Sequence, residues 1–162
     1  MTQQTILVEQ ACPTDAEAIA LLIGDLFEEI MNAVGARSFS YDADQSARQL
    51  RQLIDSGRYT ALVARERGER IVGVVTLSES CAIYAGGFFG TIPEFYVVPE
   101  RRSLCVGAML AEAARAYAQR HGWRRLEVTT PPLPQFQRTL AFYEHQGFSI
   151  TGGRKLKLEI QP

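Results

Sequence analysis

The segment from residue 91 to residue 130 most constrains how this 162-residue chain can fold. Thr91–Val98 is rich in strand-forming residues and ends at Pro99, and Leu104–Arg120 then has apolar and alanine residues at helical spacing. A second strand pattern follows at Arg124–Thr130. A strand, a helix and a strand in this order form a right-handed crossover with parallel strands in one sheet. We therefore expect 91–98 and 124–130 to be a parallel, splayed pair with a cleft between them.

Two helices are expected before the main sheet. Thr14–Glu17 reads as a capping box, which opens an apolar helix running to about Asn32. Asp42 or Asp44 can cap a second helix, because a short side-chain oxygen accepts a hydrogen bond from a free backbone amide. That helix should end near Gly57, since glycine suits a helix C-terminus.

Short polar or glycine-rich segments separate the other strand patterns. Tyr59–Arg65 and Arg70–Leu77 flank a polar turn and predict a hairpin, whereas Ser78–Gly90 is expected to cross an open surface. The remaining expected elements are a strand at Ile6–Gln10, a helix at Gln135–His145 and closing strands at Phe148–Thr151 and Arg154–Ile160. Together these patterns predict an α+β fold in one domain, residues 1–162, with a mixed, mostly antiparallel sheet and about four helices.

Composition argues against several classes of protein. Lys plus Arg total 17 against 18 Asp plus Glu, so a net charge of -1 offers no general attraction for nucleic acid or an anionic membrane. Cys12, Cys81 and Cys105 lack paired CxxC spacing, so we expect reduced thiols and no metal site. The N-terminus lacks a signal-peptide pattern, and no run approaches the roughly 20 apolar residues of a membrane helix. A cytoplasmic protein is expected.

The turn between the strand at 91–98 and the following helix is a candidate anion site. The start of that helix should present free backbone N–H groups at the positive end of the helix dipole. Arg102 adds a full charge, so phosphate binding is chemically reasonable there. An ordinary strand-to-helix connection with solvated arginines has the same pattern, and the turn alone does not separate the two.

A motif in this turn resembles the coenzyme A-binding motif of the Gcn5-related N-acetyltransferase (GNAT) superfamily. That motif is arginine or glutamine, two residues, glycine, one residue, and glycine or alanine; Arg102 to Gly107 reads Arg-Ser-Leu-Cys-Val-Gly. A second signature of that family matches Phe142 to Phe148, Phe-Tyr-Glu-His-Gln-Gly-Phe. The resemblance implies a GNAT-like fold and an acetyl-CoA-dependent N-acetyltransferase. It would move an acetyl group to a primary amine of a small molecule or peptide by direct attack on the thioester.

The resemblance also implies which residues bind the cofactor. Backbone groups around Tyr96 and Val97 would pair with the pantetheine arm, and the turn amides would hold the pyrophosphate. The expected cofactor-binding residues are Tyr96, Val97, Val98, Arg102, Ser103, Leu104, Cys105, Val106, Gly107 and Ala108.

Cys105 departs from the family pattern, which usually has glycine there and often has glycine in place of Ser103. A residue in the first helical turn does not require a positive φ, so we expect a small side chain to be tolerated, with weaker cofactor binding. Beside arginines at a helix N-terminus, Cys105 is either a reactive thiol or a small buried filler.

Direct transfer needs a neutral amine. A lysine-type amine of pKa near 10.4 is neutral at pH 7 only about once in 2,500, which corresponds to roughly 4.6 kcal/mol. Glu94 is the first candidate base, because family members frequently have an acidic residue at this place, and Glu127 on the next strand is the competitor. The resemblance implies that Tyr143 lies by the coenzyme sulfur as the acid. A backbone N–H near Val97 or Val98 would stabilise the oxyanion.

Several questions stay open at the level of sequence. Arg37–Tyr41 and the aromatic stretch Tyr84–Phe89 are candidates for the acceptor side of the cleft, but the acceptor amine is not identified. The alternative function is a non-catalytic coenzyme A-binding or regulatory module of the same fold. A homodimer is possible, because a closing strand at Lys155–Ile160 can offer an edge to a second copy.

Overall fold

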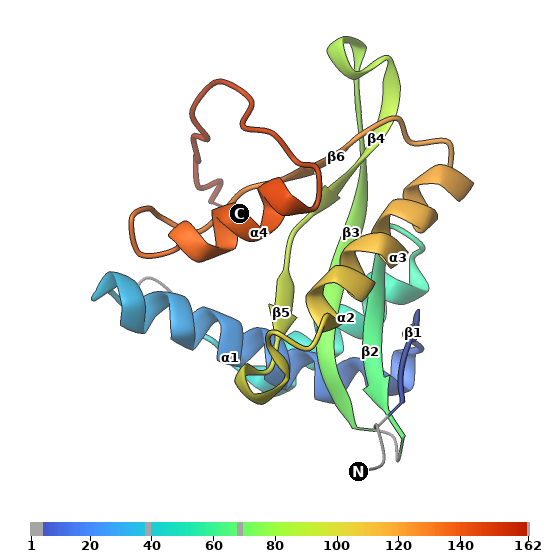
Figure 1. Ribbon diagram of the computed structural model, residues 1–162, viewed down its shortest axis with the longest axis vertical. Coiled ribbons are helices and arrows are strands. Elements are labelled where there is room, and N and C mark those ends of the chain that lie inside the picture. Colours follow the sequence, from blue (N-terminus) through green and yellow to red (C-terminus); the bar gives the residue numbers. More distant parts are fainter. Residues whose placement is uncertain (1–4, 38–39, 68–69, 162) are drawn as a thin grey trace.

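The computed structural model describes residues 5–37, 40–67 and 70–161 as an open sheet with helices on both faces (Figure 1). In chain order the elements are β1 (Ile6–Gln10), α1 (Ala16–Val34), α2 (Ala43–Asp55), β2 (Tyr59–Glu66), β3 (Ile71–Ala82), β4 (Gly87–Ile92), β5 (Phe95–Val97), α3 (Val106–Arg120), β6 (Leu126–Val128) and α4 (Gln137–His145). The strand order is β1-β2-β3-β4-β6, and β5 also pairs with β3. The pairing of β4 with β6 is parallel and the other described pairings are antiparallel, which confirms the predicted α+β class.

The long strand β3 forms the centre of the core. All of its residues from Ile71 to Leu77 are buried, and alternate side chains of a strand point to opposite faces, so both faces are covered here. Gly73 faces α3, because a Cβ built on it would lie 2.9 Å from Leu110 Cδ1. The even-numbered positions therefore face away from α3, on the side covered by α1 and α2. Each buried Val or Leu contributes roughly 1.5–3 kcal/mol to this packing.

The two N-terminal helices start at different kinds of cap. A short 3-10 turn, Pro13–Asp15, precedes α1, and the Asp15 carboxylate accepts from the Cys12 backbone N–H at 3.0 Å. The predicted capping box at Thr14–Glu17 is therefore wrong, because the reciprocal bond forms one turn earlier, before Pro13. Asp42 is confirmed as the cap of α2, since its carboxylate accepts from Gln45 N at 2.8 Å. None of the helices in the described ranges combines the length and apolarity needed to cross a membrane.

The predicted strand 91–98 is two strands rather than one. Pro93 has no N–H to donate, and the chain leaves β4 at Ile92 and starts β5 at Phe95. The parallel pairing is limited to Gly90–Ile92 with Leu126–Val128, so it is shorter than the predicted 124–130 strand allows. After the break β5 pairs with β3 alone. The splayed pair is therefore made by a strand that divides, with β4 beside β6 and β5 turned away from it.

Residues 78–90 form a hairpin instead of an open crossing. β3 continues to Ala82, the chain turns through Gly86 and Gly87 at φ values of 72° and 120°, and β4 returns antiparallel. Glycine is suited to these positive φ angles because it has no Cβ. Figure 1 shows this hairpin projecting from the top of the molecule.

The two closing strands predicted at 148–151 and 154–160 do not form. The described residues after α4, up to residue 161, contain no strand, and Leu156, Leu158 and Ile160 are 80–90% exposed. The alternating pattern is nevertheless present, because Lys157 Nζ lies 2.7 Å from Glu159 Oε1, two residues along the chain. An extended segment becomes a strand only when its backbone groups pair with a neighbour, and this one has no such neighbour within the described chain.

Candidate active site

The turn before α3 takes a left-handed backbone conformation twice. Ser103 has φ 65° and Cys105 has φ 64°. The expectation that Cys105 needs no positive φ is therefore wrong, because it lies just before the first helical residue and not within the first turn of α3. A left-handed conformation disfavours any residue with a Cβ by roughly 1–2 kcal/mol, whereas glycine adopts it freely. Cys105 is also exposed, so it is not a buried filler.

This backbone path leaves a run of amides free. In the described part of the chain, the N–H groups of residues 103–108 donate to no acceptor, and the first helical bond runs from Met109 N to Cys105 O at 2.9 Å. Free amides at a helix N-terminus form a binding site for an anion such as phosphate. The predicted pyrophosphate residues, from Ser103 to Ala108, thus lie in one turn whose amides point outward from the helix. The turn fits the pyrophosphate of coenzyme A.

Arg102 is already held by its own protein. Its guanidinium donates to both carboxylate oxygens of Glu29 on α1 at 3.0 and 2.7 Å, and its Nε donates to the Val97 carbonyl at 2.9 Å. It also lies over the Tyr96 ring, 5.3 Å from the centroid. The full positive charge expected for phosphate binding is therefore balanced by Glu29, a residue that sequence analysis does not identify.

Strand β5 has one free edge. Thr76 N donates to Glu94 O at 2.9 Å and Val98 N donates to Val72 O at 3.0 Å, so alternate residues of this segment bond to β3. By the alternation of an antiparallel ladder, the backbone groups of Phe95 and Val97 point the other way, toward the gap beside β6. Of the two residues predicted to pair with the pantetheine arm, Val97 therefore faces this gap and Tyr96 faces β3, which makes Phe95 the second candidate. The alternation also removes Val98 N as an oxyanion donor, which leaves Val97 N.

The two sequence motifs, about 35 positions apart, meet at α4. Phe142 lies against the start of α3, because a Cβ on Gly107 would be 3.1 Å from Phe142 Cε2. Phe142 and Tyr143 each make an edge-on ring contact with Phe95 of β5, at centroid distances of 5.5 and 6.0 Å. The second motif therefore places α4 across both the amide turn and the free edge of β5.

Tyr143 has a buried ring and an accessible hydroxyl. The residue is only 6% exposed, and its hydroxyl has no hydrogen bond to any described residue. Every side-chain polar atom of the described chain that is sealed from solvent has a hydrogen-bond partner. The oxygen therefore reaches accessible space. Burial raises the pKa of Tyr143 well above its ordinary value, so the phenol keeps its proton and can act as a hydrogen-bond donor.

Glu94 lies at the break between β4 and β5 and is tightly held. Tyr59 OH and Thr76 OH both donate to its Oε2, and the Thr76 hydroxyl also accepts from Glu94 N at 2.9 Å. Sequence analysis does not identify Tyr59 or Thr76. The alternation of the β2–β3 hairpin indicates that they share a face, but their contact with Glu94 depends on the break at Pro93.

Glu127 is paired differently. It lies on β6 opposite Thr91, half-buried, with its carboxylate 3.0 Å from the Arg125 guanidinium. Thr91 pairs in turn with Ser78, so Glu127 shares the sheet face of Glu94 and Thr76. The structure therefore brings both candidate bases to one face, with Glu127 bound to a cation and Glu94 bound to two hydroxyls.

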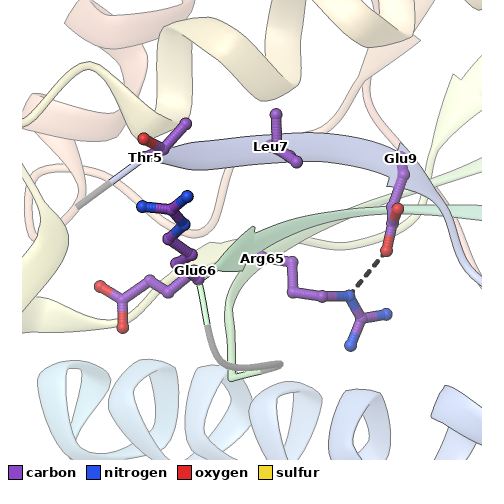
Figure 2. A pocket seen from close by; sticks show the side chains of 6 residues that line it. Thr5, Leu7, Glu9, Arg65 and Glu66 are labelled. Carbon is purple, nitrogen blue, oxygen red and sulfur yellow. Dashed lines mark hydrogen bonds and ion pairs between the residues drawn. The ribbon is translucent and has the colours of Figure 1, made fainter.

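Two pockets lie outside this region, and the first is at the edge of the sheet. Figure 2 shows a pocket of about 250 Å³ at the β1 edge, where the Arg65 guanidinium points at Glu9, 2.6 Å away. This pocket is at the opposite edge of the sheet from β6, and Glu66 in its wall is paired with Arg101. Glu9, Arg65 and Glu66 are paired within the protein and the pocket is far from β6 along the sheet, so we do not assign it to the candidate active site.

A larger pocket of about 510 Å³ lies between α1 and the start of α2. Its polar lining includes Asp25, Glu28, Arg37 and Tyr41. Burial raises the pKa of Tyr41, and the negative charge of Glu94 adds to the rise, so Tyr41 lies within electrostatic reach of Glu94. Of the stretch Arg37–Tyr41 predicted for the acceptor side, residues 38–39 lie outside the described ranges and the other three line this pocket.

The second predicted acceptor stretch, Tyr84–Phe89, lies elsewhere. It forms the tip and return of the β3–β4 hairpin, and Tyr84 and Phe88 are exposed there. Phe89 is buried and lies 6.2 Å from the Tyr84 ring. None of these residues lines the pocket beside α1.

Comparison with known proteins identifies the family. The pattern of the Acetyltransferase (GNAT) family matches residues 25–148, and no curated protein matches the chain. A ribosomal-protein-alanine N-acetyltransferase from Brucella melitensis biovar Abortus 2308 is similar in structure, with 20% identity, a TM-score of 0.71, and coverage of 97% of this chain and 100% of that chain.

An aminoglycoside acetyltransferase from an uncultured soil metagenomic sample has 18% identity and a TM-score of 0.75, and the alignment covers 96% of this chain and 97% of that chain. At these identities the two structures show a shared fold. The family pattern spans most of the chain and includes both motifs that meet at α4. The chain therefore belongs to the GNAT family of acetyltransferases.

Proposed function

We propose that this protein transfers an acetyl group from acetyl-CoA to a primary amine of a small molecule or peptide. The observation that carries the proposal is the arrangement around β5. Its free edge runs toward the turn of unpaired amides, with the Glu94 carboxylate on the α1 and α2 face and the ring of Tyr143, which carries the phenol, against Phe95 on the α3 face. A base and an acid on opposite sides of one open edge suit the transfer of a group held between them.

Acetyl-CoA supplies an activated acetyl thioester in this proposal. The amides of residues 103–108 would hold its pyrophosphate, and the backbone groups of Phe95 and Val97 would hold its pantetheine arm. The Val97 carbonyl accepts from Arg102, so this side chain would have to move for the carbonyl to pair with a ligand.

The catalytic roles fall to residues on the two sides of that edge. Glu94 would accept the proton of the attacking amine, since a lysine-type amine is neutral at pH 7 only at a cost of roughly 4.6 kcal/mol. Tyr143 would donate a hydrogen bond to the leaving sulfur, since burial keeps its phenol protonated. Val97 N would donate to the developing oxyanion. Glu127 is less suited to act as the base, because its carboxylate is already engaged by the Arg125 guanidinium, 3.0 Å away.

The acceptor would enter through the pocket between α1 and α2. Tyr41 lines this pocket and lies within electrostatic reach of Glu94, and Asp25 and Glu28 outnumber Arg37 among the charged residues of its wall. Negative charge in a concave wall raises the local concentration of a cationic ligand, which fits an amine that arrives protonated. The proposal is therefore for an acceptor that is positively charged before it reaches Glu94.

A non-catalytic coenzyme A-binding module is the second candidate. The observation in its favour is the turn itself, where Glu29 balances the charge of Arg102 and two residues other than glycine take left-handed angles. Both features argue against tight binding of the cofactor, and neither removes the free amides that would bind the phosphates.

Calorimetric titration with coenzyme A, combined with a thiol-release assay on a panel of amines, tests the proposal. We expect coenzyme A to bind and free thiol to appear with at least one cationic amine. Binding without thiol release across a broad panel would support the non-catalytic module instead. The absence of binding would contradict both functions.

Two matched variants test the assignment of the base. Glu94→Gln should lower kcat/KM by about 10² or more, because the carboxylate is lost from a half-buried, hydrogen-bonded position. Glu127→Gln is the control on the same sheet face and should leave kcat/KM nearly unchanged. The reverse order of effects would assign the base to Glu127.

A further inference from the structure

We propose that Tyr59 and Thr76 are positioning residues, which hold Glu94 so that one carboxylate oxygen is engaged and the other stays free for the amine proton. The inference rests on the proposed function, because it takes Glu94 as the base. It adds two residues from strands β2 and β3 that belong to neither sequence motif.

The contacts come from three different strand segments. Tyr59 begins β2, Thr76 lies in the middle of β3, and Glu94 lies in the break before β5. Both hydroxyls donate to the same oxygen, Oε2, and Thr76 is bonded to Glu94 a second time through Glu94 N, 2.9 Å from the threonine hydroxyl. The Thr76 side chain is completely buried, so its hydroxyl has little freedom to choose another partner.

The two contacts leave the second oxygen of Glu94 unengaged. No described residue donates a hydrogen bond to Oε1, although Oε2 receives two. A glutamate side chain is flexible when it is unbound, and a general base works only within hydrogen-bond reach of its proton. Fixing one oxygen therefore keeps the other oxygen in one place relative to an incoming amine.

Both donors keep their protons when Glu94 is charged. Burial raises the pKa of Tyr59, and the negative charge of Glu94 raises it further, so the phenol does not ionise beside the carboxylate. The Thr76 hydroxyl accepts from a backbone N–H, which directs its own hydrogen toward Glu94. The arrangement is therefore two donors facing one acceptor.

The opposite face of the sheet offers a matched control. There the Thr60 hydroxyl lies 3.0 Å from the Tyr117 hydroxyl, and Thr60 is also buried. Thr60→Val and Tyr117→Phe remove the same groups from neighbouring positions without touching Glu94. They measure what the loss of a buried threonine or tyrosine hydroxyl does to the fold alone.

The experiment compares two acceptor amines of different basicity, one with a pKa near 10 and one near 8. The less basic amine depends less on a base, because a larger fraction is already neutral at pH 7. Thr76→Val and Tyr59→Phe should each lower kcat/KM by about tenfold or more with the more basic amine. With the less basic amine the loss should be clearly smaller, and the affinity for coenzyme A should not change.

Thr76→Ser retains the hydroxyl and should restore most of the activity that Thr76→Val loses. Equal losses with both amines, or losses matched by Thr60→Val and Tyr117→Phe, would overturn the proposal, because they would indicate a purely structural role.

A second measurement needs no turnover: a crystal structure of the Tyr59→Phe, Thr76→Val double variant. We expect Glu94 to leave its wild-type rotamer there. A Glu94 side chain that stays in place would overturn the proposal even if no amine is acetylated, whereas missing activity in the wild type alone contradicts the proposed function.

Discussion

Cys105 occupies a backbone position that suits glycine. Its φ of 64° falls in the left-handed region, and Ser103 two residues earlier has nearly the same angle. The angles turn the free amides of the turn in one direction, so the strain is coupled to the candidate phosphate site. The backbone conformation of the candidate phosphate site is therefore disfavoured by the side chains of Ser103 and Cys105.

Cys105→Gly should therefore stabilise the protein. Relief of roughly 1–2 kcal/mol of left-handed strain exceeds the backbone entropy that glycine loses on folding, about 0.5–1 kcal/mol. We expect the free energy of unfolding in urea to rise by up to about 1 kcal/mol, and the affinity for coenzyme A to increase. Cys105→Ala retains the Cβ and serves as the control for loss of the thiol. A Cys105→Gly protein less stable than the alanine variant would contradict this account.

At the residue scale, sequence analysis finds the residues that belong to local motifs. Arg102 to Ala108 and Tyr143 could be identified because each motif is contiguous and its spacing follows from one turn or one helix. Tyr59, Thr76 and Glu29 could not, since their roles depend on contacts between segments far apart in the chain. The left-handed angle of Cys105 was missed because the helix starts at Val106, two residues later than its apolar spacing indicates.

At the scale of elements, helices were easier to predict than strands. Their caps and apolar spacing are local properties, and Asp42, one of the two predicted caps, does cap α2. Strand boundaries depend on the partner: β3 runs on to Ala82 because β4 returns along it, and the segment 91–98 divides because its halves have different neighbours. The break at Pro93 could be suspected from the sequence, but the change of partner could not.

Helix α4 supplies one hydroxyl to the site, and its removal should affect chemistry without affecting the fold. Tyr143→Phe should lower turnover on the order of 10²-fold while coenzyme A affinity and unfolding free energy stay unchanged, because the hydroxyl bonds to no described residue. Gly107→Ala is the contrasting variant. Its Cβ would press on Phe142, so it should destabilise the protein by about 1 kcal/mol and weaken coenzyme A binding. Equal loss of binding and turnover in Tyr143→Phe would indicate a packing role instead.

At the scale of the whole molecule, the C-terminal segment leaves a row of apolar side chains uncovered. Leu156, Leu158 and Ile160 are 80–90% exposed, and the charged residues between them, Lys157 and Glu159, pair with each other. Burying each of the three would contribute roughly 1.5–3 kcal/mol. Within the described chain, β6 ends the sheet with one unpaired edge. A segment of alternating apolar and charged residues is typical of a strand, and such an edge is where a further strand would pair.

We expect this segment to mediate pairing with a second copy of the chain. The wild type should sediment as a dimer and the Leu156→Lys, Leu158→Lys double variant as a monomer, with unchanged unfolding of the monomer because these side chains are exposed. Lys155→Gln with Lys157→Gln alters the other face of the segment and should leave the dimer intact. A wild-type chain that is monomeric at every concentration tested would contradict the expectation.

The ion pair between Arg102 and Glu29 would make the two proposed ligand sites thermodynamically dependent on each other. Glu29 lies on α1 beside Glu28, which lines the pocket between α1 and α2, whereas Arg102 belongs to the turn of free amides. A phosphate that draws Arg102 away leaves an uncompensated carboxylate on α1, next to the place where a cation would bind. By linkage, a cation that binds α1 more tightly in that state must raise the affinity for the phosphate by the same factor. One surface contact would thereby make the uptake of either substrate favour the uptake of the other.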